Sequence, residues 1–255
     1  MGNHVLDYYG EDNVNAACDI TANWNANYSA YSQSFTTLND GITYKLTSVK
    51  LWARKYVSSE TGNIQAEIYA HNGTYGTNST PTGAALATSD LFNVETGLTS
   101  VYSLIEIPFS GDQQISLTAN TQYVLVVKGV DLAGPSFRIR IGKDSLDSTH
   151  SGNEAYWAGA WNVEAHDMCF YVYGYSADLT ITETDNVTTN PVAGTYSYTI
   201  NQEVEVTATP AEHYVLLDWL VDSVSVASTA NPYTITMDVD HELTPVMGIY
   251  KLTIT

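Results

Sequence analysis

Positively charged residues are scarce in this 255-residue chain. Nine lysines and arginines stand against 28 aspartates and glutamates, which gives a formal net charge of -19 at pH 7. A surface of this sign repels the phosphate backbone of nucleic acids, so we expect no nucleic-acid partner. The charge is typical of a soluble extracellular β-protein, and it also favours divalent cations, salty surroundings or a basic partner.

Long apolar segments and targeting signals are also lacking. No run of 18 apolar residues occurs, so the sequence predicts no membrane insertion. The first thirty residues have neither a basic start nor an apolar stretch, and no secretory signal is visible. Two interpretations stay open, namely a signal that has been removed and a virion protein that is assembled in a host cytoplasm.

Catalytic signatures are missing as well. The chain has no GxSxG, no HExxH, no phosphate-binding glycine-rich loop and no DxDxDG calcium loop. The groupings of acids with histidine that we consider are His166 with Asp167, and Asp238 and Asp240 with His241. Each falls at an expected strand edge or turn, where a solvated role is the natural expectation. The sequence therefore predicts a protein that is not an enzyme.

Cysteine is rare, with only Cys18 and Cys169 present. They lie near the two ends of the first predicted module, and the first and last strands of a sandwich often lie side by side, so a disulfide is one expectation. Two buried free thiols are the other, because free cysteine behaves as a small apolar residue. The absence of CxxC spacing argues against zinc and redox chemistry.

Short alternating segments between turn residues dominate the first part of the chain, and helical periodicity is almost absent. Strands at this spacing predict an all-β protein, with a jelly-roll β-sandwich in the first module. Residues 122–128 are more continuously apolar, as in a central strand. The predicted strands are 44–52, 64–69, 122–128, 137–141 and 169–173.

The composition changes after Gly174 and becomes rich in threonine and valine. We predict a boundary near Ser176, with a jelly-roll module over 1–176 and a small β-rich repeat module over 177–255. Strands of the second module are predicted at 179–182, 203–209, 214–221 and 233–237. The string LTIT at 179–182 recurs at 252–255. Apart from chance, this repetition predicts that 252–255 begin a further copy of the module.

The first module contains several sequence motifs. They are YKLTSVKL at 44–51, GNIQAEIYA at 62–70, LTANTQYVLVV at 117–127, HSGN at 150–153 and DMCFYVYG at 167–174. Through these motifs, residues 24–174 resemble the jelly-roll domain labelled choice-of-anchor R, which occurs in extracellular and phage-borne proteins. The resemblance implies a surface-exposed β-sandwich without a catalytic constellation.

The second module carries motifs of another kind. TNPVAGTYSY stands at 189–198, VEVTATPAEHYVLLDW at 204–219 and NPYTITMDVDHELTPV at 231–246. Through them, the module resembles the bacterial repeat related to the internalin B repeat. The chain departs from that pattern at His213, where glycine is usual, and at Met247, where a final phenylalanine is usual. The resemblance implies a tandem binding or spacer module.

Three aromatic residues are the best candidates for binding a ligand. Tyr156, Trp157 and Trp161 lie in a glycine- and alanine-rich stretch before the last strand, which we interpret as a loop. Exposed aromatic rings stack on sugars, so this group predicts a glycan site. Trp157 is expected to be exposed, Trp161 also fits a core position, and Trp219 is expected in the core of the second module.

No cofactor is required, and calcium is the one candidate ion because its hard oxygen ligands suit acidic loops. Asp144 with Asp147 is the favoured pair, although such residues are also ordinary in turns. The other candidate loops hold Asp7, Glu11, Asp12 and Asn13, and Asp185 with Asn186. N-glycosylation sequons begin at Asn27, Asn72, Asn78 and Asn186.

Three functions are consistent with these features. The first is an adhesive module of an extracellular, cell-surface or virion protein, with a glycan or a surface protein as its partner. The second is a structural decoration, fibre or filament subunit whose partners are copies of itself. The third is an accessory module of a polysaccharide-degrading enzyme.

Overall fold

The computed structural model describes residues 3–21, 27–133, 138–182 and 184–249, apart from the side chain of Asn27. Its described elements are nearly all β-strands, which confirms the predicted all-β class. The chain divides into two compact units. The first unit contains residues 3–41 and 45–174, and the second contains residues 42–44 and the chain from Tyr175 onward. The repeated string at 252–255 lies outside the described residues.

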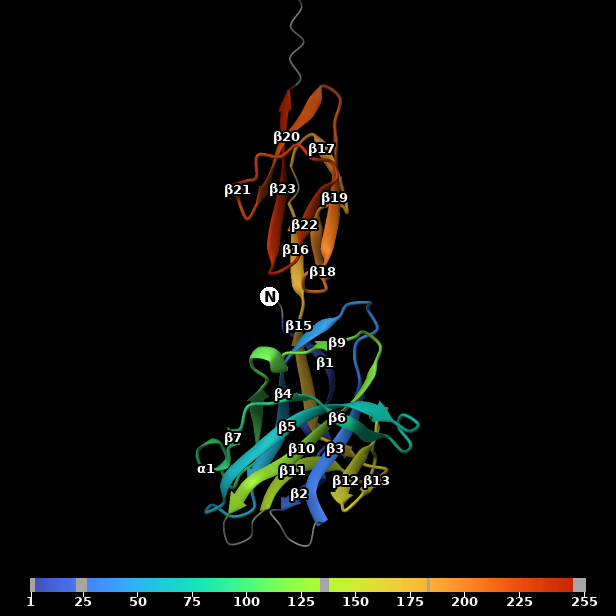
Figure 1. The fold of residues 1–255 in the computed structure, drawn as a ribbon, viewed down its shortest axis with the longest axis vertical. Coiled ribbons are helices and arrows are strands. Elements are labelled where there is room, and N and C mark those ends of the chain that lie inside the picture. The colour runs from blue at the N-terminus through green and yellow to red at the C-terminus, as the bar shows by residue number, and fades with distance from the viewer. Residues whose placement is uncertain (1–2, 22–26, 134–137, 183, 250–255) are drawn as a thin grey trace, which may run out of the picture. The chain divides into compact units, whose positions relative to one another are not determined.

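Sheet A is the eight-stranded sheet of the first unit (Figure 1). Its main path runs β1-β15-β4-β11-β14, while β2 pairs with β11, and β8 and β9 pair with β4. The strands are β1 (Asn3–Tyr9), β2 (Ala16–Thr21), β4 (Tyr44–Lys55), β8 (Ser103–Pro108), β9 (Ser116–Leu117), β11 (Arg138–Asp144), β14 (Asp167–Met168) and β15 (Phe170–Tyr175).

Sheet B is the seven-stranded sheet of the same unit. Its path runs β13-β12-β3-β10-β5-β6, with β7 on β5, so β10 is the central strand that its apolar run predicts. The strands are β3 (Asn27–Thr36), β5 (Thr61–Asn72), β6 (Thr80–Thr88), β7 (Phe92–Asn93), β10 (Gln122–Ala133), β12 (Glu154–Ala158) and β13 (Trp161–Glu164). Three short helices complete the unit: η1 (Glu11–Asn13), α1 (Val94–Gly97) and η2 (Gly111–Gln113).

The core of the first unit lies between the two sheets. Phe35 of β3 contacts Phe170 of β15 with ring centroids 6.4 Å apart. The ring centroid of Tyr123, on β10, lies 5.8 Å from that of Phe35. Leu125 and Val127 of β10 are fully buried. Since strand side chains alternate between faces, Val124 and Val126 point to the outer face of sheet B.

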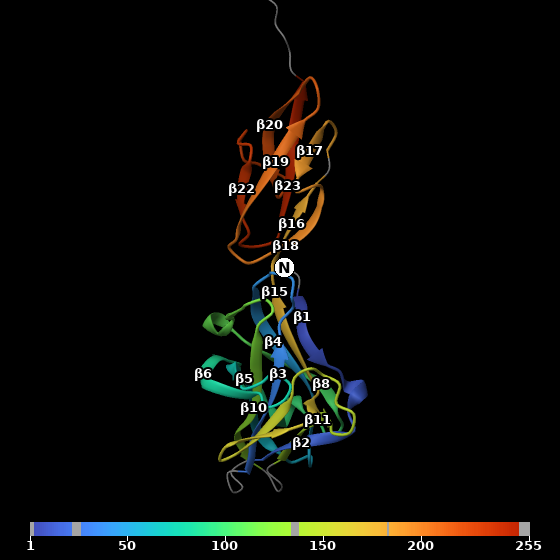
Figure 2. The same cartoon turned by 90° about the vertical axis from the view of Figure 1, so that its right-hand side faces the viewer.

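The second unit contains two smaller sheets, whose strands can be followed in Figure 2. One follows the order β18-β16-β23-β20-β21, and the other follows β17-β19-β22. The bounds are β16 (Ala177–Ile181), β17 (Val187–Asn190), β18 (Gly194–Tyr198), β19 (Glu203–Pro210), β20 (Tyr214–Val221), β21 (Val224–Ser225), β22 (Tyr233–Thr236) and β23 (His241–Ile249).

Trp219 is in the core of the second unit, as predicted. Its side chain is fully buried, its indole Nε1 donates to the carbonyl of Ala230 at 2.9 Å, and its ring stacks on Tyr233 at 5.7 Å. His213, which stands where the repeat pattern has glycine, adopts φ 70. Only glycine enters this left-handed region without steric cost, so the backbone conformation at this position explains why glycine is usual there.

Candidate ligand-binding face

The glycine- and alanine-rich stretch that we predicted as a loop is a β-hairpin. β12 and β13 pair antiparallel, and Trp157 lies opposite Trp161. Gly159 at φ 82 forms the turn, in a backbone region that suits glycine. Because strand side chains alternate, the two tryptophans share one face of sheet B, and Tyr156 lies on the other.

Trp157 and Trp161 pack together on the outer face of sheet B. Their ring centroids are 5.5 Å apart, with the planes at 66°. Both rings stay partly exposed. They cover a small apolar cluster that is separate from the core between the sheets and consists of Ala30, Val124 and Val126. The packing fixes the rings and leaves part of each available to a ligand.

Polar groups lie on the same face, next to the tryptophans. Tyr69 packs on the same apolar cluster, and its hydroxyl donates to Oε2 of Glu67 at 3.0 Å. Lys128 Nζ lies 2.6 Å from Oε1 of Glu67. Burial and the Glu67 carboxylate raise the pKa of Tyr69, so its hydroxyl remains a donor. We call Tyr69, Trp157 and Trp161, with Glu67 and Lys128, the aromatic face.

Tyr156 faces the opposite side of the hairpin. Its ring centroid lies 4.8 Å from that of Tyr28 and 6.2 Å from that of Tyr31. Tyr31 is only 5 % exposed, and burial raises its pKa. The structure therefore divides the three predicted ligand-binding residues, with two on the aromatic face and Tyr156 in a separate tyrosine cluster.

An ionic cluster lies on that opposite side and joins the hairpin to sheet A. Lys143 of β11 places its Nζ 3.0 Å from Glu154 of β12 and 3.0 Å from Glu164 of β13. Glu154 is fully buried, and burial raises its pKa against the opposing effect of Lys143. Cys18 Sγ also donates to Glu154, at 3.4 Å. The cluster therefore ties both strands of the hairpin to one lysine.

The same cluster contains a set of metal-ligand types. Carboxylate oxygens of Glu154 and Glu164 and a ring nitrogen of His166 all lie within 4.8 Å of one another. Lys143 Nζ is in contact with all three, with Nδ1 of His166 at 3.2 Å. Its ammonium group already supplies the positive charge that a metal ion would bring, so these contacts describe an internal ion pair.

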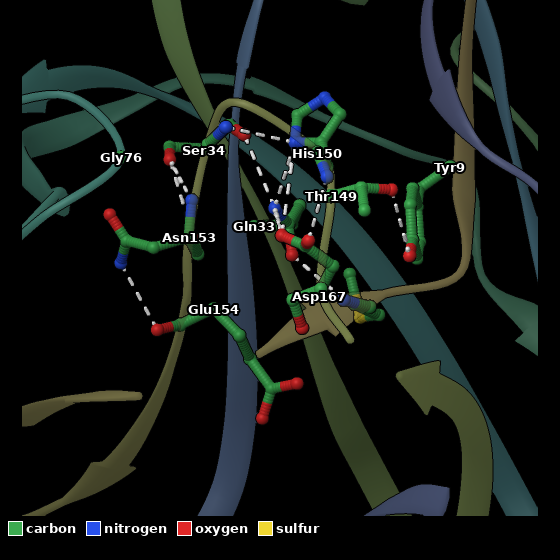
Figure 3. Close-up of polar contacts among 12 residues, drawn as sticks. Tyr9, Gln33, Ser34, Gly76, Thr149, His150, Asn153, Glu154 and Asp167 are labelled. Atoms are coloured by element: carbon green, nitrogen blue, oxygen red, sulfur yellow. Dashed lines mark hydrogen bonds and ion pairs between the residues drawn. The ribbon is translucent and has the colours of Figure 1, made fainter. Parts of the chain in front are cut away.

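A second polar network surrounds His150 (Figure 3). Asp167 accepts from Nε2 of Gln33 at 3.0 Å and from the backbone N–H of His150 at 3.0 Å. His150 Nε2 lies 3.2 Å from Asp7, and Phe170 meets the imidazole edge to face. These contacts attach the loop that carries the HSGN motif to both sheets, which is a structural role.

The solvated role that we predicted for Asp167 is wrong. Its side chain is 1 % exposed, because β14 places it between the sheets. Burial raises the pKa of Asp167, while Gln33 and His150 lower it. The grouping in the second unit does lie at the surface. There His241 contacts Asp222 at 2.8 Å and Asp238 at 2.9 Å, and both carboxylates are more than half exposed.

Both cysteines are buried free thiols, which is the second of the two expectations, and the disulfide is not formed. Cys18 on β2 pairs with Ile141, whereas the N–H of Cys169 donates to the carbonyl of Gly142 on the other side of β11. Neighbouring strands are about 4.8 Å apart, so strands that flank a third are separated by about 9.6 Å. A disulfide requires Cα atoms within about 7 Å. Burial raises the pKa of Cys169 to about 12.

The favoured calcium pair belongs to a turn. Asp144 accepts from the amide of Asn15, from the hydroxyl of Tyr9 and from the N–H groups of Leu146 and Asp147. Four donors therefore occupy both carboxylate oxygens. Among the other predicted ligands, Asp7 contacts His150, and Glu11 accepts from a tyrosine hydroxyl. Calcium stays a prediction to which these contacts add no support.

The predicted glycosylation sequons are accessible where the structure describes them. Asn72, Asn78 and Asn186 are exposed. Asn78 Oδ1 accepts from the N–H of Thr74 and shapes the loop between β5 and β6. The side chain of Asn27 is outside the described residues. Modification at these positions stays a prediction.

Sequence reasoning missed Tyr69, Glu67 and Lys128 as parts of the aromatic face. The alternation of β5 places Tyr69 and Glu67 on one face, and this signal is readable in the sequence. Their position beside the tryptophans depends on the register of β5 with β10, where Val124 lies opposite Tyr69. Pairing between distant strands is not written in a local pattern.

A known protein family resembles part of the second unit. Residues 177–245 match the model of the divergent InlB B-repeat domain, which confirms the repeat-module resemblance. This repeat type indicates a surface-associated bacterial module. No curated protein and no solved structure matches the chain. The choice-of-anchor R resemblance stays a prediction. Across the parts that the structure describes, no helix has the length and apolar character to cross a membrane.

Proposed function

We propose that this chain is a non-enzymatic binding protein of a cell or virion surface, whose first unit holds a neutral glycan on the aromatic face. The observation that carries the proposal is the packing of Trp157 and Trp161 together on the outer face of sheet B, with both rings partly exposed. The apolar faces of a sugar ring stack on such rings, and nearby polar groups bind its hydroxyls.

The charges of the face favour a neutral sugar. Lys128 and Glu67 neutralise each other at 2.6 Å, so neither presents an unpaired charge to the ligand. Both still have hydrogen-bonding capacity, and the Tyr69 hydroxyl extends the polar edge. A glycan would lie with its ring on the tryptophans and its hydroxyls towards this polar edge.

The second unit acts as a spacer in this proposal. Its family match is to a repeat module of surface-associated type, and the resemblance implies a tandem binding or spacer module. A glycan on a cell or envelope is the expected partner, and the acidic chain argues against nucleic acid. Assembly with other copies through residues 252–255 depends on a segment outside the described residues, so no described contact favours it.

A glycan array with the whole chain tests the proposal. Wild type should bind at least one neutral glycan, and Trp157→Ala and Trp161→Ala should each weaken that binding by about tenfold or more, as expected for a central aromatic contact. Tyr156→Phe is the matched control, because its side chain lies on the opposite side of the same hairpin. Equal losses for all three variants, or no binding of any neutral glycan, would contradict the proposal.

A further inference from the structure

A groove of about 670 Å³ lies on the outer face of sheet A, away from the aromatic face. Its volume is in the range of about 300–1,000 Å³ that is usual for small-molecule sites. Trp52 and Arg54 of β4 and Arg140 of β11 form its floor. One wall comes from η1 and the start of β2, and the other comes from Val101 and Tyr102. The groove is thus built by five segments of the first unit.

The arginines of this acidic chain gather at and beside this groove, whose lining also contains Asp19 and Glu11. The sequence contains three arginines, and all three lie on this face. Arg54 is opposite Arg140 in the pairing of β4 with β11, and Arg138 is two residues from Arg140 on the same side of its strand. Like charges on opposite positions of neighbouring strands repel each other, so this arrangement is unfavourable unless an anion compensates it.

Of the three arginines, two pair with a carboxylate of the groove and one does not. Asp19 pairs with Arg140 at 2.8 Å and with Arg138 at 3.4 Å. Arg54 donates to the carbonyls of Lys55 and Ser100, each at 3.3 Å, and no carboxylate of the described residues lies within ion-pair distance of it. Glu11 also lines the groove, but its Oε2 accepts from the hydroxyl of Tyr171.

Aromatic rings provide a flat surface beside Arg54. The rings of Trp52 and Tyr102 are parallel within 4°, with centroids 6.2 Å apart, and the guanidinium of Arg54 lies 5.1 Å from the Tyr102 ring centroid. A Cβ on Gly142 would lie 2.9 Å from Cδ1 of Trp52, so glycine allows the indole to rest on β11. Parallel rings next to a cation suit a ligand that has both an apolar ring face and a negative charge.

We propose that this groove is a second binding site and that it takes a carboxylate-bearing sugar, such as a uronic acid residue of an acidic glycan. Arg54 binds the carboxylate, Trp52 and Tyr102 support the sugar ring, and Asp19 and Glu11 accept from its hydroxyls. Peptides more often add to an open strand edge or enter an apolar groove, whereas this groove crosses the face of a sheet. The site is separate from the aromatic face and does not depend on the function proposed there.

Calorimetric titration of the whole chain tests the site with three probes. Tri-galacturonate carries the carboxylates, its methyl ester is the neutral counterpart, and tri-glutamate is the acidic peptide. Wild type should bind tri-galacturonate at least about tenfold more tightly than the other two probes. The guanidinium of arginine binds a carboxylate through two parallel charge-assisted hydrogen bonds, and the methyl ester lacks the negative charge for them. Trimers of glucuronate and mannuronate extend the panel to other uronates.

Two kinds of variant separate binding from folding. Arg54→Ala should weaken tri-galacturonate binding by about tenfold. Arg54→Lys should weaken it by less, because lysine keeps the positive charge but lacks the paired N–H donors of the guanidinium. Val101 is 70 % exposed at the groove wall, so Val101→Glu adds repulsion with little risk to folding and Val101→Lys adds attraction. Lys50→Ala is the control, a cation of the same sheet that pairs with Glu106 at 3.6 Å outside the groove.

The outcomes divide cleanly. Loss of uronate binding with Arg54→Ala and Val101→Glu, with Lys50→Ala unchanged, supports the site. Equal affinity for acid and ester, a preference for tri-glutamate, or failure to bind any uronate of the panel overturns it. The same holds if Val101→Glu and Val101→Lys bind equally. None of these results bears on neutral glycans, so the proposal for the groove and the proposal for the aromatic face can be rejected independently of each other.

Discussion

The two units bury different kinds of side chain. The buried charged residues among those described all belong to the first unit: Lys55, Glu60, Glu67, Lys143, Asp144, Glu154 and Asp167. In the described part of the second unit, the buried side chains are apolar except for Ser176. Buried ion pairs contribute little net stability, but removing one partner is costly. An apolar core is sufficient for a unit that acts as a spacer. Buried ion pairs in the first unit are consistent with a need to hold the elements of its binding surfaces in fixed positions.

Lys143 shows what the buried charges of the first unit do. It contacts Glu154 and Glu164, one on each strand of the hairpin that also carries Trp157 and Trp161. The tryptophans therefore lie on one side of a hairpin whose other side is fixed by the lysine. In the described part of the second unit, His241 contacts Asp222 and Asp238 at the surface, whereas the core is formed by Trp219, Met237 and aliphatic side chains.

Lys143→Met should give the largest effect. It leaves the buried Glu154 without a counter-ion, so the free energy of unfolding should fall by about 3–5 kcal/mol. Chemical denaturation monitored by circular dichroism measures the change. Adding Glu154→Gln should recover much of the loss, because the uncompensated charge is then removed. A loss below about 1 kcal/mol for the single variant would contradict the role given to the cluster.

Trp219→Phe tests the second unit. The change removes the donor to the carbonyl of Ala230 and leaves a small cavity, so we expect a loss of about 1–3 kcal/mol. Denaturation of the chain should show a destabilised second unit, while the signals of the first unit stay in place. A shift of both units together would show that they unfold as one, which would remove the contrast between them.

His213→Gly should stabilise the second unit by about 1 kcal/mol. The residue adopts φ 70, and its side chain is 79 % exposed, so little contact is lost when the strain is relieved. Thermal unfolding of this variant should occur at a higher temperature than that of wild type. Glu212→Ala, at the exposed neighbour, is the control and should change stability by less than about 0.5 kcal/mol. A destabilised His213→Gly would contradict this interpretation.

Acid should affect the first unit through Asp144. Burial opposes ionisation of this carboxyl, but hydrogen bonds from Leu146, Tyr9, Asn15 and Asp147 lower its pKa from 3.8 to about 2. A lowered pKa stabilises the fold above the unfolded value, and that contribution is lost as the pH falls from about 3.8 to about 2. In Asp144→Asn, the free energy of unfolding should depend less on pH over this range than in wild type. Denaturation at a series of fixed pH values measures this dependence. An unchanged slope would contradict the assignment.

The sequence predicted the strands well, because alternation and turn residues are local signals. Segments 44–52, 64–69 and 122–128 lie within β4, β5 and β10. It failed at β12 and β13, where glycine and alanine around the tryptophans resemble a loop. It also failed where function depends on pairing between distant strands. Neither the contact of Lys143 with Glu154 nor the opposition of Arg54 and Arg140 follows from a local pattern.

Calorimetric titration with the neutral glycan that binds best on the array tests the aromatic face most directly. Wild type, Tyr156→Phe and the double variant Trp157→Ala with Trp161→Ala should be compared at the same ionic strength. We expect wild type and Tyr156→Phe to bind alike and the double variant to lose at least about a hundredfold in affinity, with circular dichroism unchanged. A folded double variant that binds as tightly as wild type would contradict the account.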